Sequence, residues 1–179
     1  MGVKKAQTRE RILDAAAAAL LQRGPSKPSV GEVMGAAGLT VGGFYAHFDN
    51  KDALMLEVFQ QMLRQRRERI AEVDPQLSGE ERRTLVAAFY LSRKHRDSRD
   101  EGCPIPSATA DLAELPDSFR QVLAEHLELM SAQLAARPEE ADVALADIAL
   151  MVGGLALARA LGPGALSDRL LRAAKAAVR

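Results

Sequence analysis

Apolar side chains recur at helical spacing along the chain. Ile12, Ala16 and Leu20 share one face of a helix expected over residues 8–23, and Gly24 followed by Pro25 supplies its stop signal. The same spacing returns in later segments. Their separators are the charged loop from His95 to Gly102, Pro116, Pro138 and the Gly162-Pro163-Gly164 break. These later helices are expected at residues 79–96, 104–113, 117–136, 139–161 and 165–178. The pattern predicts an all-α protein of about nine helices.

Two short helices are expected between residues 29 and 46. Ser29 stands at an N-cap position, and the apolar residues from Val30 to Ala37 repeat at i, i+3, i+4 and i+7. Gly38 can adopt the left-handed conformation that reverses the chain, and Thr40 can cap a helix over residues 40–46. Two short helices joined by a glycine-containing turn form the helix-turn-helix pattern.

Composition and charge agree with this picture. The chain is 47% hydrophobic but has only five Phe, two Tyr and no Trp, which favours helix. Lys plus Arg equals Asp plus Glu, 24 against 24, whereas residues 1–51 contain seven basic and four acidic residues and so carry +3. A mildly basic head suits contact with phosphate, although an ordinary solvated surface explains three charges as well.

The remaining composition points to the cytoplasm. A single cysteine, Cys103, cannot form an internal disulfide and matches no metal-ligand spacing, so a reducing compartment, no metal and no cofactor are expected. The first twenty residues lack a secretory pattern. The longest apolar run, Ile148 to Ala158, is too short to span a bilayer, so no membrane is expected. Cys103 itself is either inert or a sensor of electrophiles and oxidants.

Residues 37–54 carry the most specific signal. They run Ala-Gly-Leu-Thr-Val-Gly-Gly-Phe-Tyr-Ala-His-Phe-Asp-Asn-Lys-Asp-Ala-Leu, which closely resembles the DNA-binding signature of the TetR family of bacterial regulators. The Gly102-Cys103-Pro104-Ile105 stretch also resembles a feature of one branch of that family. Two positions depart from the usual pattern: Pro25 replaces an aromatic residue, and Gly43 replaces a threonine or serine whose hydroxyl would contact phosphate.

The resemblance implies a division of the chain into two domains. Residues 1–51 are expected to form the helix-turn-helix domain, and residues 52–179 a helical ligand-binding and dimerisation domain. A connecting helix at 52–72, capped by Asp49 or Asn50, ends in a charged stretch from Arg64 to Glu72.

The third helix supplies most candidates for DNA contact. Gly42 and Gly43 let the backbone approach the major groove, and two glycines inside a helix are costly without a functional reason. Thr40 and Val41 are placed for base edges, whereas Tyr45 and other polar side chains suit phosphate oxygens. The candidate DNA-binding residues are Ser29, Thr40, Val41, Gly42, Gly43, Tyr45, His47 and Lys51.

Several of these residues have a plainer interpretation. Ser29 and Thr40 are also suitable as helix caps alone, Tyr45 as a packing residue with a wet hydroxyl, and His47 as a surface histidine without a role. Phe44 and Phe48, four residues apart, are expected in the core.

The C-terminal helices are expected to join two copies of the chain. One short recognition helix spans few base pairs, so specificity normally needs a dimer on a pseudo-palindromic operator in double-stranded DNA. The alternative is that these helices are only intrachain core. The candidate dimer residues are Leu145, Ile148, Val152, Leu155, Leu166, Leu170 and Leu171.

The middle helices resemble the family's effector-binding region, so an unidentified small-molecule effector is expected. The alternative is that their apolar residues only form the hydrophobic core, as apolar helix positions more often do. Each helix-turn-helix domain is one head of the dimer. A ligand that binds more tightly to a dimer whose two heads are too close or too far apart for the operator would release the DNA. The candidate lining residues are Phe89, Tyr90, Arg93, Ile105, Phe119, Leu123, His126, Met130 and Met151.

Two other functions compete with a ligand-responsive repressor. An enzyme on an all-α scaffold would need a catalytic grouping, and the sequence shows no nucleophile triad, paired-carboxylate motif, phosphate loop or metal spacing. A helical module that acts only through protein contacts remains the other alternative. DNA binding separates the regulator from both.

Overall fold

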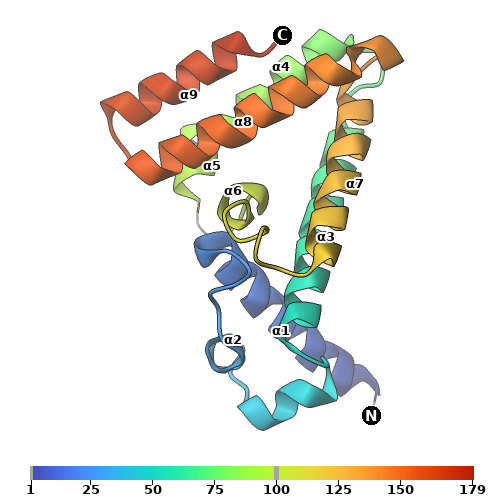
Figure 1. Ribbon diagram of the computed structural model, residues 1–179, viewed down its shortest axis with the longest axis vertical. Coiled ribbons are helices and arrows are strands. Elements are labelled where there is room, and N and C mark those ends of the chain that lie inside the picture. Colours follow the sequence, from blue (N-terminus) through green and yellow to red (C-terminus); the bar gives the residue numbers. More distant parts are fainter. Residues whose placement is uncertain (1, 99–100) are drawn as a thin grey trace. The chain divides into compact units, whose positions relative to one another are not determined.

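The computed structural model describes residues 2–98 and 101–179, and within them it contains helices and turns but no strand (Figure 1). This confirms the predicted all-α class. The helices are α1 (Gly2–Arg23), α2 (Val30–Ala36), the 3₁₀ helix η1 (Val41–Ala46), α3 (Lys51–Ala71), α4 (Gly79–Tyr90), α5 (Arg93–Asp97), α6 (Ile105–Ala108), α7 (Asp117–Leu134), the 3₁₀ helix η2 (Pro138–Glu140), α8 (Ala141–Leu161) and α9 (Ala165–Ala177).

Several predicted elements differ from the observed ones. α1 begins at Gly2 rather than at residue 8. The helix predicted over 79–96 is two helices, because the chain leaves helical geometry at Leu91 and Ser92 then caps α5 by accepting from His95 N at 3.1 Å. Part of the loop predicted at 95–102 therefore belongs to α5. The helix predicted over 104–113 is the single turn α6 followed by non-helical turns.

The chain forms two compact units. The first comprises the residues up to Leu63 together with Cys103–Gln121, and the second comprises Arg64–Gly102 and Val122–Arg179. Both α3 and α7 therefore contribute residues to each unit. The limits of these compact units differ from the domain boundary expected between residues 51 and 52. That boundary between a DNA-binding and a ligand-binding domain stays a prediction.

The core of the first unit forms where the apolar pattern predicts it. Ile12, Ala16 and Leu20 of α1 are fully buried, and α1 packs on α2 and α6. From α3, Phe59 is fully buried and its ring centroid lies 6.1 Å from that of Phe119. Burial of such side chains contributes about 1.5–3 kcal/mol each, and it gives the helix-turn-helix a fixed base.

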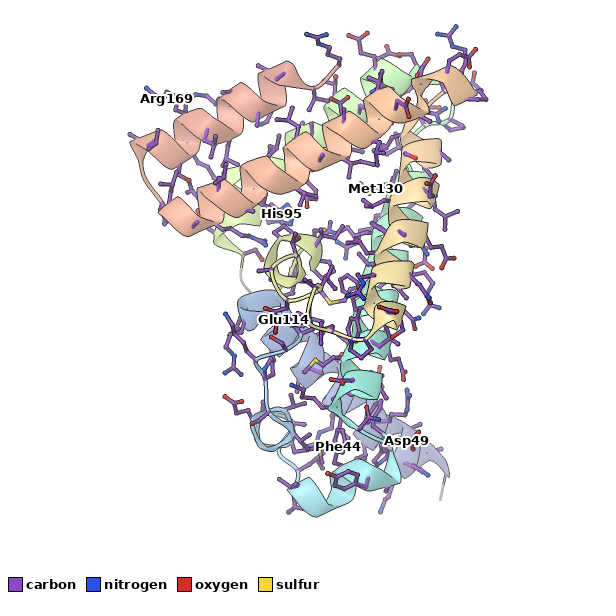
Figure 2. The ribbon with its side chains drawn as sticks, in the orientation of Figure 1. Phe44, Asp49, His95, Glu114, Met130 and Arg169 are labelled. Atoms are coloured by element: carbon purple, nitrogen blue, oxygen red, sulfur yellow. The ribbon has the colours of Figure 1, made fainter. Side chains whose placement is uncertain are left out.

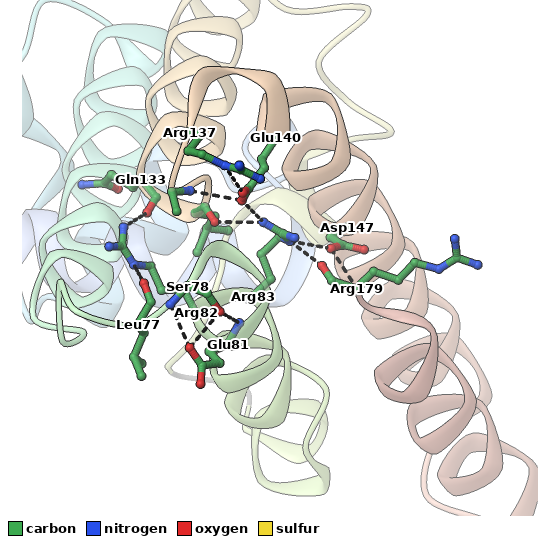
Figure 3. A network of polar contacts seen from close by, with 12 residues as sticks. Leu77, Ser78, Glu81, Arg82, Arg83, Gln133, Arg137, Glu140, Asp147 and Arg179 are labelled. Carbon is green, nitrogen blue, oxygen red and sulfur yellow. Dashed lines mark hydrogen bonds and ion pairs between the residues drawn. The ribbon is translucent and has the colours of Figure 1, made fainter.

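In the second unit α8 packs on both α9 and α4. A largely buried ion-pair network also joins α4 to α8 and η2: Arg83 Nε lies 3.1 Å from Asp147 and its Nη1 lies 3.2 Å from Glu140 (Figure 3). The segment Pro138–Leu161 is long and apolar enough to cross a membrane, by length and composition. Core helices also meet this criterion, and α8 packs on both α9 and α4.

Candidate nucleic-acid interface

The turn between α2 and η1 is fixed by backbone geometry. Gly38 has φ +66°, the left-handed region that glycine adopts without steric cost. Its N–H donates to Gly35 O at 3.0 Å, and Leu39 N–H donates to Met34 O at 2.8 Å. These bonds satisfy the last carbonyls of α2. The expected reversal at Gly38 is confirmed.

The inner side of η1 is anchored by aromatic rings. Phe44 is fully buried and Phe48 is 5% exposed, with ring centroids 5.8 Å apart, which confirms that both belong to the core. The Arg9 guanidinium stacks over Phe48 at 4.8 Å and forms an ion pair with Glu57 at 2.5 Å. The outer side of η1 therefore has a fixed orientation.

The outer side of η1 brings together five of the predicted contact residues. Thr40, Val41, Gly42, Gly43 and Tyr45 are all exposed, Tyr45 to 69%. Figure 2 shows this segment at the opposite end of the first unit from α6, with Phe44 labelled on it. The element is a 3₁₀ helix rather than the α-helix expected, so it is tighter and narrower.

The free chain gives no reason for glycine at 42 and 43. Neither residue has a positive φ. A Cβ added to Gly42 would meet no atom within 4 Å, and one added to Gly43 would meet only Met34 Cε at 3.8 Å, an ordinary contact. Gly42 and Gly43 cost helix stability without relieving any clash. Glycine is the residue that lets a backbone come closest to another surface.

The two hydroxyls offered as caps behave differently. Ser29 forms a full capping box: its Oγ accepts from Glu32 N at 3.2 Å, and Glu32 accepts from Ser29 N at 2.8 Å. The Ser29 backbone and the nearby Arg23 lower the pKa of Glu32 to about 2. Thr40 occupies the N-cap position of η1 but its hydroxyl makes no capping bond. Its exposed hydroxyl is therefore available to another molecule.

Lys51 and His47 lie beside the exposed face rather than on it. Lys51 Nζ donates to Ser26 O at 2.6 Å, which ties the start of α3 to the loop before α2. The ammonium keeps two further N–H groups as donors. His47 is half-buried, and its Nδ1 is buried without a hydrogen-bond partner in the described residues.

Asp111 is a residue that sequence reasoning missed. Its Oδ2 accepts from Ser26 N at 3.2 Å and from Ser26 Oγ at 2.6 Å, across 85 positions of sequence. Gly24, with φ +80°, lets the loop come this close, since a Cβ there would lie 2.5 Å from Asp111 Oδ2 and 2.7 Å from Ser107 O. No local pattern signals a contact over this separation.

Most of the basic residues of the first helix are used inside the unit. Arg9 pairs with Glu57, Arg23 pairs with Glu32 at 2.7 Å, and Arg11 donates to the carbonyl of Ala37. Lys4, Lys5 and Lys27 are exposed. The exposed part of the net positive charge of residues 1–51 therefore comes more from lysines than from arginines.

The expected effector-lining residues lie in three places. Tyr90, His126, Met130 and Met151 are buried in the second unit, and Leu123 is half-buried there. Ile105 and Phe119 are buried in the first unit.

Two other expected lining residues lie on the surface instead. Phe89 is 74% exposed because the buried face of α4 runs through Ala87 and Tyr90. Arg93 is exposed and pairs with Asp168 at 2.7 Å.

The expected dimer residues also divide. Ile148, Leu155 and Leu171 are at most 3% exposed, because they face the packing of α8 with α9 and α4. These three belong to the chain's own core rather than to a free surface. Leu145 is 42% and Leu166 is 54% exposed, while Val152 and Leu170 are half-buried.

Comparisons with known proteins found family matches over two parts of the chain. A family model described as bacterial regulatory proteins of the tetR family matches residues 12–58, and one described as a tetracyclin repressor-like C-terminal domain matches residues 79–174. The HTH-type transcriptional regulator AcrR of Shigella flexneri is 43% identical over 54 residues, a segment that covers 30% of this chain and only 25% of AcrR.

Solved structures share the fold over nearly the whole chain. The reduced form of Escherichia coli NemR is 21% identical, with a TM-score of 0.77 over 97% of this chain and 95% of NemR. A TetR-family regulator from Agrobacterium tumefaciens is 17% identical, with a TM-score of 0.78 over 97% of this chain and 98% of that one. At these identities the likeness shows the fold alone.

Proposed function

Because the chain belongs to the TetR family of transcriptional regulators, with a DNA-binding helix-turn-helix domain, we propose that it is a homodimeric repressor of a pseudo-palindromic operator, released by a small-molecule effector. The observation that carries the proposal is the exposed face from Thr40 to Tyr45, with two glycines that the free chain does not need. Such a face suits a major groove, where added side chains would hold the backbone away. Access to DNA places the protein in the cytoplasm.

Each exposed group has a proposed role. The Thr40 hydroxyl and the Val41 methyl groups lie against base edges, the latter against a thymine methyl. Tyr45, His47, Lys51 and the Ser29 turn face phosphates and set the register. Ser29 caps the start of α2, and Lys51 binds the loop before α2 through Ser26 O. Their proposed phosphate contacts therefore depend on the folding of that loop.

The outer faces of α8 and α9 are proposed as the dimer interface. Leu145, Leu157 and Leu166 are 42%, 58% and 54% exposed. On α8 the small residues Ala149 and Gly153 lie between the exposed leucines and are exposed too, so a symmetry-related helix can approach closely. Paired with their mates, the two helices would form a four-helix interface.

The proposal is tested by DNA-binding titration with the purified chain. The probe is a duplex of the DNA upstream of its own gene, and the control is a scrambled duplex of equal length. We expect the upstream duplex to bind at least about 10³-fold more tightly, with affinity that falls as salt rises.

Equal affinity for both duplexes, or no binding at low salt, would refute the proposal. Absent binding would instead favour a helical module that acts through protein contacts.

A further inference from the structure

α3 and α7 bring an arginine and a histidine together inside the second unit. Arg67 Nη1 lies 2.9 Å from Nδ1 of His126, and His126 is 1% exposed. A guanidinium only donates, so Nδ1 must be the acceptor in this hydrogen bond. The neutral ring of His126 therefore carries its proton on Nε2, on the opposite edge of the imidazole.

The Nε2 proton of His126 lacks an acceptor in the described part of the chain. Nε2 is buried and lacks a hydrogen-bond partner among the described residues. Gln133 lies seven residues after His126, on the same face of α7. The side-chain amide of Gln133 donates through its own Nε2 to Arg67 O at 3.4 Å. Its buried Oε1 also lacks a partner among the described residues. Buried polar groups are nearly always paired, so an open donor and an open acceptor on one helix face point to a missing molecule.

The surroundings of His126 are positively charged. Within the described part of α3, Arg64 pairs with Glu68 at the surface, whereas Arg66 and Arg67 have no carboxylate within 4.0 Å. Burial, then Arg67 and Arg66, lowers the pKa of His126 to about 4. Burial also lowers the pKa of His95 to about 4, and Arg66 adds to that shift. Arg66 is thus close enough to act on both imidazoles.

We propose that this cluster binds a small carboxylic acid as its anion, with one carboxylate oxygen accepting from His126 Nε2 and the charge balanced by Arg66 and Arg67. Met130, labelled on α7 in Figure 2, lies between His126 and Gln133 in the sequence and is 5% exposed. We assign the ligand an apolar body that contacts this side chain. Gln133 Oε1 accepts from a hydroxyl or amide group of the same ligand. This inference rests on the proposed effector response and names the class of effector.

The test compares acids with their neutral isosteres. Four acids that each carry a hydroxyl group as a second donor are titrated into the full chain by calorimetry, each beside its primary amide: 6-hydroxyhexanoate, 8-hydroxyoctanoate, 4-hydroxybenzoate and 3-(4-hydroxyphenyl)propanoate. We expect at least one carboxylate to bind about 10- to 100-fold more tightly than its amide, the gain of charge-assisted hydrogen bonds. Arg67→Gln should reduce that preference to within about threefold. The matched control Arg69→Gln, exposed on the same helix, should leave it unchanged.

A second measurement needs no variant. Nitrogen-15 NMR of the histidine rings should show the His126 Nε2–H resonance move when the bound carboxylate is added, and not with its amide. Equal affinity of acid and amide, or no binding by any of the four acids, would overturn the inference. DNA titration is run on the same protein: intact DNA binding with no acid binding removes only this inference, whereas acid binding without DNA binding removes the proposed function instead.

Discussion

The glycine pair of η1 provides a test in which fold stability and DNA affinity change in opposite directions. In Gly42→Ala the added Cβ meets nothing within 4 Å, and in Gly43→Ala it meets only Met34 Cε at 3.8 Å. Neither position has a positive φ. Each substitution should therefore leave the free chain unstrained and raise its free energy of unfolding by up to about 1 kcal/mol, because alanine loses less backbone entropy.

DNA affinity should move the other way. A methyl group between η1 and the groove displaces the backbone and costs each head one base-edge contact, about 1–3 kcal/mol. Since a dimer carries two heads, a loss of about 1.4 kcal/mol per head weakens binding about a hundredfold. Gly35→Ala is the matched control, because its Cβ also meets nothing within 4 Å but it lies in α2, outside the proposed contact residues. It should stabilise the fold without weakening DNA binding.

Urea unfolding and operator titration on the same preparations give both quantities. The reasoning is refuted if Gly42→Ala and Gly43→Ala bind operator as tightly as the parent, or if they lose affinity only in proportion to a loss of stability. The first result would remove the groove contact as the reason for glycine. The second would mean that the chain itself requires glycine at these positions.

Four further outcomes are expected. Gly24→Ala should destabilise the fold by about 2–4 kcal/mol in urea unfolding, because it adds left-handed strain and a clash with Ser107 O; a loss below about 0.5 kcal/mol would contradict this. Lys51→Ala should reduce the salt slope of DNA binding by about one per subunit, and an unchanged slope would leave Lys51 with only its bond to Ser26. Leu157→Glu should convert dimers to monomers in light scattering, while Leu129→Glu, exposed on α7, should not. Burial lowers the pKa of both His95 and His126 from 6.5 to about 4, so unfolding takes up protons between pH 6.5 and 4, and the free energy of unfolding should decrease as the pH is lowered through that window. His126→Gln should make this pH dependence shallower, and an unchanged slope would exclude His126 as a cause.

The local pattern predicted the parts of the fold that depend on neighbours in sequence. The stripe Ile12, Ala16 and Leu20, the turn at Gly38 and the buried pair Phe44 and Phe48 all follow from helical spacing and backbone freedom. The exposed face of η1 follows as its complement. The break at Ser92 was missed because a side-chain cap ended a periodicity that otherwise continued.

Contacts between distant segments were beyond the pattern. Asp111 holds Ser26 across 85 positions, and nothing near either residue announces it. Arg66 and Arg67 fall in the charged stretch from Arg64 to Glu72, for which the apolar pattern predicted no buried residue. They nevertheless continue the spacing of the buried Phe59 and Leu63, a signal that would have placed them inward. On α8, apolar character all round did not separate the faces, so core residues such as Leu155 were assigned to the dimer.

Hydroxyl-radical footprinting on the upstream DNA tests the central claim most directly. Two η1 faces held by a dimer should protect two patches of sugar-phosphate backbone, centred about one helical turn or slightly more apart and related by the operator's pseudo-two-fold axis. Gly42→Ala should weaken the protection of both patches together. A single protected patch, or protection that is uniform along the duplex, would contradict a symmetric pair of heads on successive grooves.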